Sequence, residues 1–313
     1  MVDAPRIGPA IQTRDLTRNF GELVAVDGVD LTVRHGELFS ILGPNGAGKT
    51  TTIKLLCGLL RPTSGSARVM GHDISENPLA VKQVIAVSPQ ETAVAEHLSA
   101  RENLELMAGL HGIERRRARR RAEPLLELMG LAERAGDQAR KYSGGMKRRL
   151  SIAMALVSDP YVLFLDEPTI GLDPQSRRGM WEYIERLKSR MTIVLTTHYL
   201  EEADALADRI AVVDTGRVIA RGSPTQLKDG MEGAHATLVE ARDLTEDAIE
   251  ALTAIYPHVR PVDGGVEIDD DNVSLHRIED CLRPRGVEIV SIRKRQVTLD
   301  DVFLELTGKE LRE

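Results

Sequence analysis

The sequence has little cysteine, no excess of basic residues and no long apolar run. Its two cysteines, Cys57 and Cys281, are too few for a disulfide framework or a tetrathiolate metal site, so we expect two small buried thiols in a reducing compartment. The formal net charge of −7 argues against nucleic-acid binding, because such proteins neutralise phosphates with lysine and arginine. No run of about 18 residues is apolar, and the N-terminus lacks the core of a signal peptide, so the sequence predicts neither a membrane-spanning helix nor a leader.

What the sequence does contain is an alternation of short apolar runs with longer helical stretches. Such runs are typical of strands covered on both faces, and their alternation with helices favours an α/β fold with a largely parallel sheet. Residues 10–33 alternate more regularly and indicate an antiparallel β subdomain, and the helical pattern over 97–158 predicts a helical insertion at about residues 91–160. The parallel strands are predicted at residues 38–42, 84–87, 162–165, 192–196 and 210–213.

The last quarter of the chain reads as a separate domain. Residues 222–236 are rich in glycine, serine, proline and charge, and are interpreted as a linker. Strand and helix patterns then follow in the order β-α-β-β-α-β, which is typical of a small ferredoxin-like α+β domain. A final helix is predicted from Thr298, because Asp301 completes a capping box. We therefore divide the chain into a large domain, residues 1–228, and a C-terminal accessory domain, residues 229–313.

A phosphate-binding loop is indicated at residues 43–50, which match the pattern G-x-x-x-x-G-K-[ST] between an apolar strand and a helical segment at 51–60. Glycines let backbone N–H groups curl around a β-phosphate, and the helix N-terminus adds roughly half a positive charge. Lys49 would place a full charge near the β and γ oxygens, and the Thr50 hydroxyl is placed to bind Mg²⁺. The alternative is a chance glycine-rich turn. The strand–loop–helix context favours a nucleotide site made of Gly43, Pro44, Asn45, Gly46, Ala47, Gly48, Lys49 and Thr50.

Four further polar residues follow predicted strands and complete a hydrolytic site. Asp166 fits a carboxylate that helps to hold Mg²⁺, and Glu167 is the candidate general base for the attacking water. His198 follows another strand of the same sheet and could reach the γ-phosphate, while Gln90 could contact Mg²⁺ or the water. Taken singly, the alternatives are a solvated carboxylate pair, a surface or core histidine, and a solvated loop glutamine.

A second anion site is indicated at Ser143, Gly144 and Gly145, which precede a strong helical pattern at 146–157. Ser143 is a natural N-cap and the glycines leave the first-turn amides accessible, although a plain capped helix would look the same. Two phosphate sites in a chain with one nucleotide loop suggest that the second serves the nucleotide of another subunit.

Together these motifs resemble the ATP-binding subunit of ABC transporters over residues 7–228. The family motifs fall in order at the Walker A loop extended to Thr51, Gln90, the signature at residues 142–146, Asp166 followed by Glu167, Asp173 and His198. The resemblance also places Phe20 against the adenine ring. It implies a P-loop NTPase core of ABC type that binds ATP and Mg²⁺ and hydrolyses ATP.

The resemblance further implies partners and a place of action. Such a subunit powers a separate polytopic permease from the cytoplasmic face of the membrane, and the intact motifs favour a homodimer that shares two ATP molecules. The signature has Tyr142 and Met146 where the common form has leucine and glutamine, and together with residues 299–304 it resembles the daunorubicin/doxorubicin-resistance ATPases. We expect export of drugs, lipids or other hydrophobic compounds. A soluble ABC ATPase that acts in assembly without a permease is the alternative.

Overall fold

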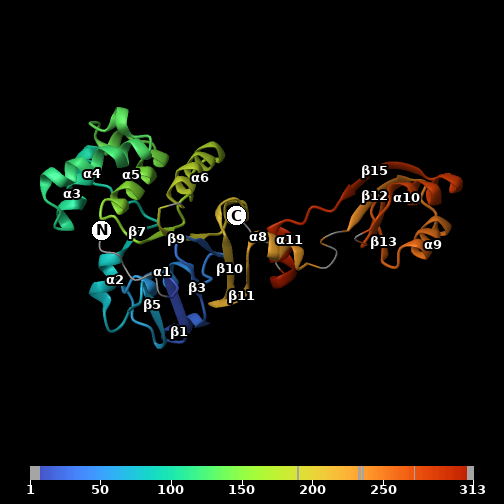
Figure 1. Ribbon diagram of the computed structural model, residues 1–313, viewed down its shortest axis with the longest axis horizontal. Helices are drawn as coiled ribbons and strands as arrows, with labels where there is room; N and C mark the ends of the chain where they lie inside the picture. The colour runs from blue at the N-terminus through green and yellow to red at the C-terminus, as the bar shows by residue number, and fades with distance from the viewer. Residues whose placement is uncertain (1–7, 189, 232–233, 235, 271, 309–313) are drawn as a thin grey trace. The chain divides into compact units, whose positions relative to one another are not determined.

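The computed structural model describes residues 8–188, 190–231, 234, 236–270 and 272–308. The chain forms two compact units (Figure 1). One takes the chain up to Pro224 and resumes at Phe303, and the other is Thr225–Val302. Each unit has its own buried apolar core.

The larger unit is built on a six-stranded sheet. Its strands are β4 (Leu38–Leu42), β7 (Ile85–Ser88), β8 (Val162–Asp166), β9 (Thr192–Thr197), β10 (Arg209–Asp214) and β11 (Arg217–Gly222). They lie in the order β11-β10-β4-β9-β8-β7, with β11 antiparallel at one edge and the other pairs parallel. Because β4, β8 and β9 are buried along their whole length, the prediction of strands covered on both faces is confirmed.

An antiparallel sheet packs beside the parallel one, as predicted. It consists of β1 (Ile11–Phe20), β2 (Leu23–Val29), β3 (Thr32–Val33), β5 (Ser64–Val69) and β6 (His72–Asp73). The sequence analysis missed β5 and β6, because β5 begins with Ser-Gly-Ser and carries no apolar run. Ile11, Leu16 and Val69 of this sheet share one buried core with Phe39 and Phe164 of the parallel sheet.

The helices of the larger unit fall into two sets. Around the sheet lie α1 (Lys49–Leu56), α2 (Pro78–Val84), α6 (Pro174–Lys188) and α7 (Leu200–Leu206). The helical insertion contains α3 (Ala100–Leu110), α4 (Arg115–Leu128) and α5 (Gly144–Leu156), which group together in green in Figure 1. Helix α3 begins with a full capping box, in which the Ser99 hydroxyl accepts from the Glu102 N–H and the Glu102 carboxylate accepts from the Ser99 N–H.

The smaller unit is a four-stranded antiparallel sheet with two helices. The elements are β12 (Thr237–Arg242), α9 (Glu246–Ile255), β13 (Val259–Val262), β14 (Gly265–Ile268), α10 (Leu275–Leu282) and β15 (Glu288–Lys294). The strand order is β13-β14-β12-β15. Val239, Val266 and Ile268 of the sheet pack with Leu252 of α9 and Ile278 of α10. The order of elements is the one that the sequence predicted.

Two short helices near the C-terminal end of the chain can be compared with the sequence analysis. The segment interpreted as a linker contains a short helix, α8 (Pro224–Asp229), which proline at its first position favours. The last helix, α11 (Leu299–Thr307), has the predicted cap, since Thr298 Oγ1 accepts from the Asp301 N–H at 3.2 Å. Both cysteines are buried and free, as expected.

Candidate nucleotide site

The glycine loop between β4 and α1 is held against neighbouring backbone. A Cβ at Gly43 would lie 2.1 Å from the Val213 carbonyl oxygen, and one at Gly48 would lie 2.2 Å from the Ala25 carbonyl oxygen. Gly48 also has a φ of +95°, in the left-handed region that glycine tolerates. Because Gly48 is the N-cap of α1 and no acidic residue lies in the first turn, no side chain competes with an anion for the helix N-terminus.

Lys49 is buried at the base of this loop. Its Nζ donates hydrogen bonds to the carbonyl oxygens of Gly43 at 2.7 Å and Pro44 at 3.1 Å. It also lies 3.0 Å from Glu167 Oε1, and both side chains are only 5% exposed. A buried ammonium and a buried carboxylate therefore neutralise each other across the loop.

Asp166, at the end of β8, is held by two hydroxyls. Thr50 Oγ1 donates to Asp166 Oδ1 at 3.0 Å, and Thr196 Oγ1 of the neighbouring strand β9 donates to the same oxygen at 2.6 Å. The Thr50 hydroxyl and the Asp166 carboxylate thus meet at one point. Among the described residues no three His, Cys, Asp or Glu side chains gather as a metal site. This sparse oxygen set suits Mg²⁺, which uses one or two protein ligands together with phosphate oxygens and water.

Glu167 occupies a turn that directs its carboxylate back toward the loop. Its φ is +48°, and its N–H donates to the carbonyl and the hydroxyl of Thr196 at 3.1 and 3.0 Å. Its second oxygen, Oε2, lies 2.7 Å from His198 Nδ1. Glu167 therefore lies between the loop lysine and the histidine that follows β9, and backbone strain of this kind is common where function fixes a side chain.

A cavity of about 330 Å³ lies in front of these groups. Phe20, at the end of β1, and Gln90, after β7, both line it. Phe20 is 43% exposed, and the Arg18 guanidinium carbon lies 4.6 Å from its ring centroid. Sequence reasoning missed Leu23 and Ala25, which lie in an alternating strand without a motif. The full lining is Phe20, Leu23, Ala25, Asn45, Gly46, Gly48, Lys49, Thr50, Thr51, Gln90 and Glu167.

The signature residues do not join this cavity. Ser143 caps α5 by accepting from the Met146 N–H at 3.3 Å, and Ser143 and Gly145 line a separate hollow of about 180 Å³. The two hollows share no lining residue. Asp173 also lies outside the loop cavity, where it accepts from the Ser176 N–H and hydroxyl; these bonds lower the pKa of its carboxyl.

Two buried charges beneath the site were not foreseen. Arg148 of α5 is 3% exposed, and burial lowers the pKa of its guanidinium. Glu202 of α7 is fully buried and accepts from the Trp181 indole N–H at 3.1 Å; burial raises the pKa of its carboxyl to about 7. No sequence signal separates them from surface residues, because Arg148 lies between Lys147 and Arg149, and Glu202 follows Glu201.

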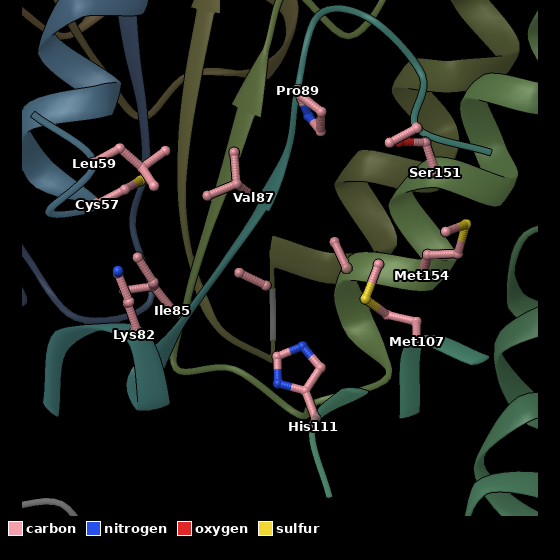
Figure 2. A pocket seen from close by; sticks show the side chains of 13 residues that line it. Cys57, Leu59, Lys82, Ile85, Val87, Pro89, Met107, His111, Ser151 and Met154 are labelled. Atoms are coloured by element: carbon pink, nitrogen blue, oxygen red, sulfur yellow. The ribbon is translucent and has the colours of Figure 1, made fainter. Parts of the chain in front are cut away.

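An apolar groove of about 410 Å³ lies between the sheet core and the helical insertion of the larger unit. Figure 2 shows it with Cys57, Leu59 and Lys82 on one side and Met107 and His111 on the other. The groove also includes Ile85, Ala86, Val87, Pro89, Ala93, Ser151, Met154 and Ala155. Pro89 is its link to the nucleotide cavity, because the next residue, Gln90, lines that cavity.

A parallel strand that leads through such a loop into a helix is how P-loop NTPases hold a nucleotide, and this fold belongs to that class. A family model described as ABC transporter matches residues 26–170. Daunorubicin resistance ATP-binding protein DrrA3 of Streptomyces coeruleorubidus is 43% identical to this chain over 97% of each. The chain belongs to the ABC transporter ATP-binding family and is an ABC transporter ATPase.

Two further comparisons bear on activity and assembly. Nod factor export ATP-binding protein I of Cupriavidus pinatubonensis is 38% identical over 99% of this chain and 94% of its own length. A dimeric ATP-binding cassette in a post-hydrolysis state, bound to ADP and Pi, is similar with a TM-score of 0.61 and 25% identity, over 68% of this chain and 98% of its own. Within the described part of this chain, no helix has the length and apolar character to cross a membrane.

Proposed function

We propose that Glu167 is the general base for ATP hydrolysis and that Lys49, His198 and Gln90 complete the catalytic group. The observation that carries this proposal is the position of Glu167, 3.0 Å from Lys49 and 2.7 Å from His198 at the edge of the loop cavity. When a triphosphate enters, Lys49 exchanges its carboxylate partner for phosphate oxygens. Glu167 is then free to accept a proton from water, while His198 holds its second oxygen.

The same proposal assigns the nucleotide contacts. Residues 43–51 hold the phosphates, and Phe20 stacks on the base. Thr50 and Asp166, with Gln90, would hold Mg²⁺, which neutralises charge on the phosphate oxygens when bound.

We propose a homodimer in which each signature completes the partner's site. The hollow at Ser143 and Gly145 is separate from the loop cavity within one chain, so a nucleotide contacted by both needs two chains. The solved relative with ADP and Pi is dimeric. A homodimer with twofold symmetry provides two equivalent sites, with Ser143, Gly144, Gly145 and Asp173 facing the nucleotide of the other subunit.

We propose that a polytopic permease docks in the apolar groove, with the chain at the cytoplasmic face of the membrane. An apolar hollow rimmed by Lys82 and His111 suits the end of an amphipathic helix from a cytoplasmic loop. Its continuity with the Gln90 segment would let the permease sense the nucleotide. The named relatives act in daunorubicin resistance and Nod factor export, which supports export of drugs, lipids or other hydrophobic compounds.

We propose that residues 1–228 are the nucleotide-binding domain and that residues 229–313 are a ferredoxin-like accessory domain. The strand order β13-β14-β12-β15 and the two crossover helices support the ferredoxin-like assignment. The accessory domain would stabilise the dimer or tune its ATPase rate. A chain that ends at Lys228, with unchanged dimerisation and ATPase rate in the assembled complex, would remove this part of the proposal.

The test of the proposed function uses Glu167→Gln, which should bind ATP but barely hydrolyse it. The tagged variant is expressed in its native host and purified from detergent-solubilised membranes with ATP and Mg²⁺. Recovery of a stoichiometric polytopic membrane protein is the expected result. A dimer found wholly in the soluble fraction with soluble proteins attached would contradict the transport role and favour an assembly ATPase. Efficient hydrolysis by the variant would contradict the role of Glu167.

A further inference from the structure

Arg148 connects three parts of the larger unit that the proposed mechanism treats separately. It lies in the second turn of α5, the helix that Ser143 caps. Its guanidinium donates to the carbonyl oxygens of Pro89 at 2.5 Å and Gln90 at 2.8 Å, in the segment after β7. One side chain thus links the signature helix to the backbone of the glutamine that lines the nucleotide cavity.

The same guanidinium also holds the turn that carries the general base. It donates to the carbonyl oxygens of Asp166 at 2.7 Å and Pro168 at 2.8 Å, and to that of Glu167. Arginine has five N–H donors in a fixed planar fork, and all five are used here. The backbone on both sides of Glu167 is therefore fixed to α5 by one rigid group.

The burial of Arg148 favours a rigid connection between α5 and the two backbone segments that it contacts. Arg148 is 3% exposed, so its donors have little access to water and each unmade bond would leave a buried polar group unpaired. The carboxylates of Asp166, Glu202 and Glu167 interact with its charge. A second bond supports the link, because Ser151, one turn along α5, lies 3.1 Å (Oγ to Oγ) from Ser88 at the end of β7.

We propose that Arg148 is a positioning residue that couples the signature helix to the Gln90 segment and the Glu167 turn of the same chain. This inference rests on the proposed dimer, in which the signature contacts the partner's nucleotide. A small displacement of α5 when that nucleotide arrives is transmitted through the guanidinium to the general base and to Gln90. Each of the two sites therefore responds to occupancy of the other.

The test replaces Arg148 in the full-length chain by lysine and, separately, by glutamine. Lysine keeps the charge but has three donors, so it satisfies at most three of the five carbonyls. The matched control is Arg121→Lys, because Arg121 also donates to a backbone carbonyl, that of Val157 at 2.9 Å, but contacts no motif. Four quantities are measured: the ATP-binding stoichiometry and the Kd in a Glu167→Gln background, the ATPase rate per bound nucleotide, and the Hill coefficient.

The expected result is a Kd within about twofold of the parent chain and a rate per site reduced by about a hundredfold, with a Hill coefficient close to 1. The control should match wild type in all four quantities. A merely structural role would lower the binding stoichiometry while the rate per bound nucleotide and the Hill coefficient stay unchanged, and that result would overturn the proposal. Loss of nucleotide binding in both variants would make Arg148 a folding residue and overturn it as well. A wild-type chain that bound no ATP would instead contradict the proposed function itself.

Discussion

At the scale of single residues, two substitutions test whether the Thr50 hydroxyl binds the metal ion. Thr50→Ala removes the donor to Asp166 Oδ1 and the proposed Mg²⁺ ligand, while Thr50→Ser keeps both. We expect alanine to abolish the gain in ATP affinity that Mg²⁺ provides, a loss of about tenfold or more, and serine to retain most of it. Calorimetric titration of ATP with and without Mg²⁺ measures this. An equal Mg²⁺ effect in the wild type and the alanine variant would remove Thr50 from the metal site.

The buried carboxyl of Glu202 gives a pH dependence of stability with a defined sign. Burial raises its pKa to about 7 in the folded chain, against about 4.3 when unfolded, so between these values the folded state binds more protons. The stabilisation from protonated Glu202 is complete below about pH 4 and is lost as the pH rises through 7. The side chain of Glu202→Gln never ionises and keeps an acceptor for Trp181. The free energy of unfolding of this variant at pH 8 should therefore exceed that of wild type by roughly 2–4 kcal/mol.

Urea unfolding of both chains at pH 5 and pH 8 checks this prediction. The advantage of the glutamine variant should shrink as the pH falls to 5. An equal difference at the two pH values would show that the substitution acts through packing and not through the proton.

At the scale of the elements, two glycine substitutions of the same size should have opposite effects. Gly48→Ala places a Cβ at a φ of +95° and 2.2 Å from the Ala25 carbonyl oxygen, so it should destroy the loop and ATP binding. Gly109 lies inside α3 with no atom near its Cβ position and an ordinary φ, so Gly109→Ala should stabilise the chain by about 0.5–1 kcal/mol. Thermal unfolding and ATP binding of both variants decide this. Loss of stability in Gly109→Ala would mean that α3 does not tolerate a methyl group.

The capping box of α3 should by itself contribute measurably to the free energy of unfolding. Ser99→Ala removes the acceptor for the Glu102 N–H and should cost about 1 kcal/mol of unfolding free energy. The matched control is Ser75→Ala, an exposed serine in a turn, which should be neutral within about 0.5 kcal/mol. Equal losses in the two variants, measured by urea unfolding, would show that the capping box contributes nothing specific.

The elements that the sequence could predict are those with a repeating physical pattern. Strands β4, β8 and β9 are apolar because both of their faces are covered. The loop at residues 43–50 needs Gly43 and Gly48 because neighbouring backbone lies where their Cβ atoms would be. Strand β5 has no such pattern, because partner strands on both sides define it more than its own side chains. The hydrogen bonds of Arg148 reach residues 18 to 59 positions away in sequence, and no local spacing encodes them.

At the scale of the whole molecule, the separation of the loop cavity from the hollow at Ser143 and Gly145 leads to a prediction about mixed dimers. Lys49→Ala damages the loop and Ser143→Arg damages the signature, so either homodimer should be inactive. In a mixed dimer one site combines both defects, and the other combines an intact loop with an intact signature. An equimolar mixture should therefore recover up to about a quarter of wild-type ATPase activity. A mixture as inactive as its components, with mixed dimers shown to form, would contradict sharing of sites between chains.

The chain contains a single tryptophan, and its indole N–H donates to the buried Glu202 carboxylate. Trp181 lies on α6, which follows Asp173, while Glu202 lies on α7, which follows His198. Ionisation of Glu202, or displacement of one helix against the other, changes the electric field at the only indole. The unlabelled protein therefore carries its own optical probe between α6 and α7, and a shift of its emission maximum would report either change without a dye.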